Sequence, residues 1–279
     1  MSKDRRFTAA CVQLASDIDP EANLNAAEAA IRSARAAGAD LILTPETTDM
    51  MEIKRRDAFA KAKDETAHPG LARLRALAAE LGCWLLVGSL VIRLSEERLA
   101  NRSFLIDPAG GVSARYDKIH MFDAAPREGE AYRESAGYRP GAEAVLAEGP
   151  ARIGMTICYD MRFPDLYLRL ARAGAEVLTA PSAFTRPTGA AHWEVLLRAR
   201  AIETGCFMLA PAQCGTHAAT EGMARETWGH SLIISPWGEV LADGGEAPGI
   251  VRASLDLSEV AKARRRIPSL SGARAFSGP

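Results

Sequence analysis

Four polar side chains stand out, three where the chain is expected to leave a buried strand or hairpin and one, Glu134, in a loop. They are Glu46 at the end of "LILTPE", Lys118 in "RYDKIHMFD", Glu134 in "EAYRES" and Cys158 after "RIGMTI". A thiol ionises near pH 8.5 and needs a base or a cation to attack well at neutral pH. A carboxylate can accept its proton, and an ammonium can hold an oxyanion. If the cysteine, the glutamates and the lysine meet in one pocket, the expected chemistry is acyl transfer through a thioester.

Each of these residues also has an ordinary structural explanation. A strand-end glutamate or a lone lysine usually meets solvent, and a cysteine in an apolar segment is commonly a small buried hydrophobe. The chain has five cysteines, an odd number, and they are widely spaced. That pattern fits reduced thiols better than a disulfide framework and predicts a cytoplasmic protein.

Helix and strand signals alternate along the chain, as is typical of an α/β protein. Gly38 and Gly82 each follow an apolar-periodic segment, where they indicate helix ends. The predicted helices span 22–38 and about 70–81, and the predicted strands span 39–46, 84–90, 103–108 and 112–118. The last two strands are joined through "AGG", which indicates a hairpin.

The second half of the sequence resembles the first half. The matching pairs of segments, in the same order along the chain, are 35–46 with 171–182, 81–90 with 204–213, and 101–112 with 229–240. Short Ala-Gly and Pro-Gly strings can recur by chance in any α/β protein. Three ordered matches nevertheless favour two similar halves related by a pseudo-twofold.

The apolar strands must be covered on both faces. Helices can shield one face and the sheet of the other half can shield the second, which predicts a four-layer α-β-β-α sandwich. We expect one domain over 1–267, with chemistry beyond the strand ends. The polar, Gly-rich segment 268–279 is expected to be a tail that is either disordered or crosses to a partner subunit.

Five segments together resemble the nitrilase superfamily of carbon–nitrogen hydrolases, in that family's order and over most of the chain. They are "LILTPE", "YDKIHMFD", "YRES", "CYDMRFPDL" and "PSAFTRPTGAAHWEVLLRARAIE". Within the superfamily the segments look most like the deaminated glutathione amidase branch, with omega-amidase second. The resemblance implies the sandwich fold, a homodimer or higher homo-oligomer, and no metal or organic cofactor.

The resemblance also implies a catalytic triad of Glu46, Lys118 and Cys158, supported by Glu134. On this hypothesis Cys158 attacks a primary amide of a small carboxylate substrate and Glu46 shuttles the proton. Lys118 and the backbone N–H of Tyr159 hold the oxyanion. The products are an acid and ammonia.

A substrate carboxylate would be bound best by an arginine. Arg162, four residues after Cys158, and Arg186, in "FTRPTGAAHW", are the candidates, and either could equally form a structural ion pair. His192 and Trp193 are expected to open the helix "WEVLLRARAIE", where they could wall the pocket or serve packing alone.

Other functions stay open. A nitrilase or an N-carbamoyl hydrolase would use the same three residues, and a protein of this fold could be a non-catalytic interaction module. Cys206, Cys214 and His217 lie close in sequence, but their spacing is not that of a usual zinc site.

The composition limits the kinds of binding partner to be expected. The net charge is −1, which gives no reason to expect nucleic acid. No apolar run approaches the roughly 20 residues that a membrane helix needs. The expected partners are a small amide substrate and further copies of the chain.

Overall fold

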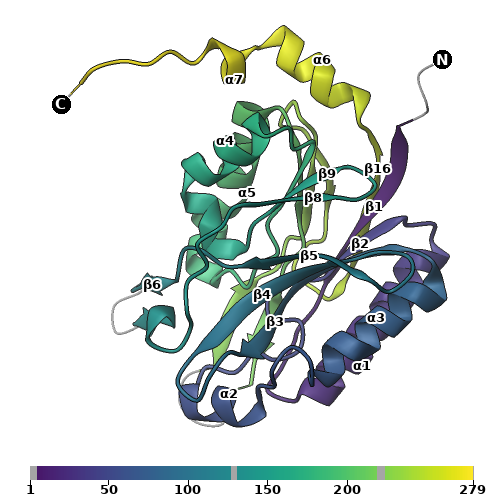
Figure 1. The fold of residues 1–279 in the computed structure, drawn as a ribbon, viewed down its shortest axis with the longest axis vertical. Coiled ribbons are helices and arrows are strands. Elements are labelled where there is room, and N and C mark those ends of the chain that lie inside the picture. The colour runs from purple at the N-terminus through teal and green to yellow at the C-terminus, as the bar shows by residue number, and fades with distance from the viewer. Residues whose placement is uncertain (1–4, 127–130, 219–223, 279) are drawn as a thin grey trace.

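A computed structural model describes residues 5–126, 131–218 and 224–278. Its centre consists of two six-stranded mixed sheets (Figure 1). The first sheet has the order β16 (Gly249–Asp256), β1 (Arg6–Gln13), β2 (Leu41–Leu43), β3 (Trp84–Arg93), β4 (Leu99–Ile106) and β5 (Val112–Asp117). The second has the order β8 (Val145–Glu148), β9 (Arg152–Met155), β10 (Val177–Thr179), β11 (Phe207–Ala210), β14 (Leu232–Ile234) and β15 (Val240–Asp243).

The two sheets have the same plan. In each, three central strands are parallel, namely β1-β2-β3 and β9-β10-β11, and every flanking strand pairs antiparallel with its neighbour. The repeated sequence segments overlap β2 and β10, β3 and β11, and β4 and β14, which occupy equivalent places in the two sheets. The predicted pseudo-twofold is therefore confirmed, and so is the β4–β5 hairpin.

Helices cover the outer face of each sheet. α1 (Pro20–Ala36) and α3 (Pro69–Leu81) lie on the first sheet, and α4 (Pro164–Arg172) and α5 (Arg186–Thr204) lie on the second (Figure 1). Side chains alternate along β1 accordingly: Ala10 and Val12 pack with the α1 and α3 core, while the Cys11 sulfur lies 4.0 Å from the Leu232 carbonyl oxygen of the second sheet. The predicted four-layer α-β-β-α sandwich is confirmed.

The helix ends follow the chemistry of caps. Asp19 accepts a hydrogen bond from the N–H of Glu21 at the start of α1, and Gly82 ends α3 in the left-handed region at φ 58°. The α5 prediction was wrong at its start. The helix begins at Arg186, not near His192, because Pro187 stands in its first turn, where the fixed proline φ suits a helix start.

Smaller elements surround the sandwich. Two ribbons pair β6 (Asp123–Ala124) with β7 (Tyr132–Arg133), and β12 (Cys214–His217) with β13 (Arg225–Trp228). The remaining helices are α2 (Arg55–Lys61), α6 (Ser258–Arg266) and the single turn α7 (Ser269–Gly272), with short 3-10 turns at Glu134–Ala136 and Cys158–Arg162. α6 and α7 lead from the end of β16 to the C-terminal segment (Figure 1).

Candidate active site

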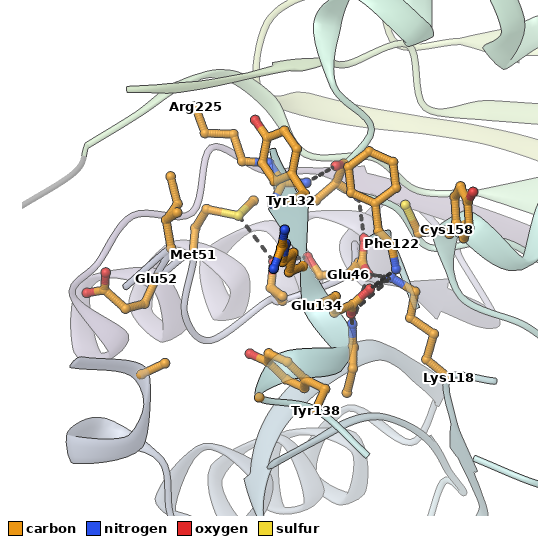
Figure 2. A pocket seen from close by; sticks show the side chains of 18 of the residues that line it. Glu46, Met51, Glu52, Lys118, Phe122, Tyr132, Glu134, Tyr138, Cys158 and Arg225 are labelled. Carbon is orange, nitrogen blue, oxygen red and sulfur yellow. Dashed lines mark hydrogen bonds and ion pairs between the residues drawn. The ribbon is translucent and has the colours of Figure 1, made fainter. Parts of the chain in front are cut away.

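Cys158 stands on a sharp turn after β9. Its φ of 48° lies in the left-handed region, which residues with a Cβ rarely adopt. The turn is held because the Cys158 N–H donates to the Pro181 carbonyl at 3.0 Å and the Ile157 N–H donates to Asp160 at 2.9 Å. Such strain persists only where the surrounding structure fixes it. Here it directs the sulfur toward Glu46 and Phe122 (Figure 2).

Glu46 follows β2 and is 4% exposed. Its Oε1 accepts hydrogen bonds from Lys118 Nζ and Asn101 Nδ2, both at 2.9 Å. Its Oε2 accepts the backbone N–H of Ala183 at 2.8 Å. The carboxylate is therefore fixed from both of its oxygens.

Lys118 follows β5 and lies between two carboxylates. Its Nζ is 2.9 Å from Glu46 Oε1 and 2.8 Å from Glu134 Oε2 (Figure 2). The Phe122 N–H also donates to Glu134 Oε2, at 2.6 Å. The Lys118 ammonium has three N–H donors. One donates to Glu46, and a second can serve both contacts to Glu134. The third is then available to a ligand.

The charges of the three residues are coupled. Burial opposes the charged form of Glu46, but the Lys118 ammonium and a hydrogen bond with the Cys158 thiol hold the pKa of Glu46 below its usual value. Burial opposes the charge of Lys118 too, yet the carboxylates of Glu134 and Glu46 raise the pKa of Lys118 well above its usual value. Burial, and then the charge of Glu46, raise the pKa of the Cys158 thiol. The resting site thus has an ionised Glu46, a charged Lys118 and a neutral thiol.

These groups line one cavity of about 230 Å³. All five residues that the sequence predicted for the chemistry are on its wall: Glu46, Lys118, Glu134, Cys158 and Tyr159. The wall also carries the aromatic rings of Phe122, Tyr132 and Tyr138 (Figure 2). The arrangement can deprotonate a thiol beside a bound carbonyl and stabilise the negative charge that develops on the carbonyl oxygen.

The residues predicted to bind substrate lie elsewhere. Arg162 contacts the His192 ring and lies over the rings of Tyr159 and Phe184. Arg186 forms an ion pair with Glu246 at 2.8 Å. None of Arg162, Arg186 and His192 is among the residues that line the cavity. Their role in substrate binding stays a prediction that this geometry does not favour.

Asn101 and Arg225 are among the polar wall residues that sequence reasoning missed. Asn101 bridges the site, since its Nδ2 donates to Glu46 and also to Glu134 Oε1 at 3.2 Å. Arg225 comes from β13, which belongs to neither sheet. Asn101 lies inside a repeated segment, which is a signal that could have found it. Nothing in the pattern around Arg225 indicates the cavity.

Two other expectations concern metals and membranes. Within residues 5–126, 131–218 and 224–278, no group of three His, Cys, Asp or Glu side chains is placed to hold a metal ion. His217 places one ring nitrogen 2.6 Å from the Ser16 carbonyl oxygen and the other 2.6 Å from the Thr227 hydroxyl. Over the same residues, no helix has the length and apolar character to cross a bilayer.

Fold and site together define a class: an α-β-β-α sandwich protein with a thiol, two carboxylates and an ammonium in one buried cavity. Comparison with known proteins agrees with this class. The family model described as carbon-nitrogen hydrolase matches residues 8–265. The chain belongs to the carbon–nitrogen hydrolase family, the nitrilase superfamily, as its motifs predicted. The prediction that it is an enzyme acting on carbon–nitrogen bonds is likewise confirmed.

Individual relatives cover nearly the whole chain. The chain is 38% identical over 272 residues to a deaminated glutathione amidase of Yersinia enterocolitica, covering 96% of this chain and 93% of that protein. The crystal structure of the C. elegans NitFhit protein has a TM-score of 0.88 at 35% identity, covering 96% of this chain and 65% of that chain. An amidase from Nesterenkonia has a TM-score of 0.78 at 25% identity, covering 94% of this chain and 95% of that chain.

Proposed function

We propose that this protein is an amidase that hydrolyses the primary amide of a small carboxylate substrate through a thioester on Cys158, in the manner of a deaminated glutathione amidase. The observation that carries the proposal is that Cys158 lines the same cavity as Glu46 and Lys118, whose carboxylate and ammonium lie 2.9 Å apart. The relatives at 38% identity over nearly the full chain support the amidase branch.

Acylation begins with a proton transfer. Because the pKa of the Cys158 thiol is raised, the thiol needs a base, and the ionised Glu46 shares its cavity wall. As Glu46 takes the proton, the sulfur forms a bond to the amide carbon and the carbonyl electron pair moves onto oxygen. The remaining N–H of Lys118 and the backbone N–H of Tyr159, at the start of a helical turn, stabilise that oxyanion.

Collapse of the tetrahedral intermediate breaks the carbon–nitrogen bond. Glu46 returns its proton to the nitrogen, which leaves as ammonia, and Cys158 keeps the acyl group as a thioester. A water molecule then gives a proton to Glu46 and attacks the thioester carbon. The carbon–sulfur bond breaks, the acid leaves, and the thiol recovers the proton from Glu46.

Glu134 has a positioning part in this scheme. It binds Lys118 on the side away from Glu46 and is itself anchored by the Phe122 N–H. Without it, the ammonium would be held by Glu46 alone and could move out of reach of the oxyanion.

An ammonia-release assay tests the proposal. The panel contains deaminated glutathione, 2-oxoglutaramate, simple primary amides, nitriles and an N-carbamoyl compound. A Cys158→Ala variant should abolish turnover, whereas Cys83→Ala, which removes a buried thiol outside the cavity, should retain it. Turnover by Cys158→Ala would contradict the mechanism. A preference for 2-oxoglutaramate, for nitriles or for the carbamoyl compound would replace the substrate assignment, and inertness of the wild type on every compound would favour a non-catalytic module.

Two expectations about assembly stay predictions. We expect a homodimer or higher homo-oligomer, which light scattering measures directly. We also expect 1–267 to behave as one domain and the segment after it as a tail, so limited proteolysis should cut within 268–279 and leave the rest whole.

A further inference from the structure

Arg225 places a guanidinium on the cavity wall. Its Nη2 donates to the Ala183 carbonyl at 2.6 Å, and its guanidinium carbon lies 5.5 Å from the centre of the Tyr132 ring. Figure 2 shows the Arg225 and Tyr132 side chains close together, across the cavity from Lys118. The cation is therefore held in place by a carbonyl and an aromatic ring.

Among the residues that the structure describes, no carboxylate pairs with this cation. In the described part of the chain, Arg225 forms no ion pair, and its Nε is shut off from solvent without any acceptor. The acids of the cavity wall are already engaged: Glu46 and Glu134 bind Lys118, and Glu52 binds Lys61 at 2.8 Å. A partly desolvated charge without a counter-ion costs free energy, which an anionic ligand would offset.

A single residue joins Arg225 to the catalytic base. Ala183 receives the Arg225 hydrogen bond on its carbonyl and donates its own N–H to Glu46 Oε2 at 2.8 Å. β13, the strand of Arg225, also bonds to the residue after Ala183, since the Trp228 N–H donates to the Phe184 carbonyl at 2.9 Å. The guanidinium thus stands at a fixed place relative to the Glu46 carboxylate.

We propose that Arg225 binds the carboxylate of the substrate and so selects amides that carry a negative charge at the end remote from the scissile bond. The inference rests on the proposed amidase function and names the specificity residue of that site. A guanidinium suits this role because it presents several N–H donors in one plane to a carboxylate. For this role Arg225 replaces the two arginines that the sequence suggested. Arg162 and Arg186 do not line the cavity, and their side chains contact His192 and Glu246.

A competing explanation is that Arg225 acts through Glu46. Its positive charge helps to keep Glu46 ionised, and losing that effect would slow every substrate alike. Carboxylate binding, by contrast, affects only substrates that carry the carboxylate. Two amides of similar length separate the explanations: glutaramate, which has a terminal carboxylate, and pentanamide, which has none.

The experiment compares Arg225→Gln and Arg225→Lys with the wild type on both amides. Arg225→Gln should lower kcat/KM for glutaramate by about 10- to 100-fold, mainly through KM, because it removes a charge-assisted hydrogen bond. The rate on pentanamide should change little, and Arg225→Lys should recover part of the loss. Arg56→Gln is the matched control, since that arginine is 91% exposed and lies outside the cavity wall. Equal losses on both amides, or no loss on glutaramate, would overturn the inference.

A binding measurement is independent of turnover. Calorimetry with glutarate, a dicarboxylate without an amide, should detect binding to the wild type and a loss of affinity of about 10- to 100-fold in Arg225→Gln. Glutarate binding that depends on Arg225 in a protein that releases no ammonia would contradict the proposed function but not this inference. Glutarate binding that is absent from the wild type, or unchanged in Arg225→Gln, would overturn it. If Arg225→Gln does not fold, Arg225→Lys replaces it in both the kinetic comparison and the binding measurement.

Discussion

The buried carboxylate of Asp160 accepts the backbone N–H of His120 at 3.0 Å, which joins the turn of Cys158 to the loop that follows Lys118. The same carboxylate accepts the Ile157 N–H at 2.9 Å, one residue before the thiol. Cys158 and Lys118 follow strands of different sheets, and the buried Asp160 side chain connects the two segments.

Replacing Asp160 should therefore disturb both the fold and the rate. In Asp160→Asn, one carboxylate oxygen becomes an NH₂ group that faces backbone N–H donors, and the charge is lost. We expect the free energy of unfolding to fall by about 2 kcal/mol, and kcat to fall more than KM changes. Urea unfolding and steady-state kinetics measure the two effects.

Tyr116→Phe is the control for that variant. It removes one hydrogen bond to Asp160, of 2.7 Å, and leaves the backbone donors in place. Its loss of stability should be the smaller of the two, with kcat retained. An Asp160→Asn protein as active as Tyr116→Phe would show that Asp160 does not position the site.

Glu46 should be required for turnover but not for folding. Glu46→Gln keeps the shape of the side chain but cannot accept the thiol proton, so kcat should fall by about 10²- to 10⁴-fold. The fold should persist because Lys118 keeps Glu134 as a partner. Glu52→Gln changes another carboxylate of the cavity wall, whose partner is Lys61, and should retain activity. Similar rates in the two variants would contradict the assignment of the base.

The pH dependence follows from the direction of the Glu46 shift. The pKa of Glu46 is lowered in the folded protein, so the base stays ionised through the neutral range and kcat/KM should decline only below the usual glutamate pKa of about 4.3. The same shift contributes stability that is complete above the unfolded pKa and is lost as the pH falls through the lower, folded pKa. A pH–rate profile with an acid limb well above that range would contradict the assignment.

Lys118 should matter for stability as well as for rate. Lys118→Met leaves Glu46 and Glu134 buried without their cation, and breaking a buried pair in this way costs about 3–5 kcal/mol. Burial would then raise the carboxyl pKa values, so the loss should shrink at mildly acidic pH, where the carboxyls bind protons. Denaturant unfolding at neutral and mildly acidic pH measures this. An equal loss at both pH values would argue against the charge explanation.

The sequence was sufficient to predict the sandwich because its signals are local. Gly82 ends a helix, β2 is wholly apolar and β3 largely so, and the repeat places equivalent strands in both halves. The residues at the strand ends could be grouped because the repeat gives the two halves equivalent strands, which can end together at one end of the sandwich.

The substrate side of the cavity could not be predicted in the same way. Arg162 and Arg186 were chosen because they lie close in sequence to motifs, but their side chains turn to His192 and Glu246. Arg225 reaches the cavity only because the β12–β13 ribbon docks on residues 183–185, a contact between segments about 40 residues apart. No periodicity or spacing encodes such a contact.

Gly88 gives the last prediction, because it lies directly behind the turn of Glu46. A Cβ on Gly88 would stand 2.0 Å from the Thr44 carbonyl oxygen and 2.3 Å from that of Pro45. Both are backbone atoms, so they can yield only if the strand end itself moves, and Glu46 moves with it. Gly88→Ala should therefore lower kcat/KM strongly as well as stability, since a shift of about 1 Å at a reacting group can cost about 100-fold.

Gly249→Ala is the matched control, a glycine in β16 of the same sheet where an added Cβ has its nearest neighbour at 3.9 Å. Kinetics and urea unfolding of the two variants separate the effect of the backbone clash behind Glu46 from the effect of any alanine in place of a strand glycine. Because the added Cβ of Gly249→Ala meets only an ordinary van der Waals contact, this variant should keep both its rate and its stability. If Gly88→Ala were as active as Gly249→Ala, the backbone contact behind Glu46 would not be what holds the base in place.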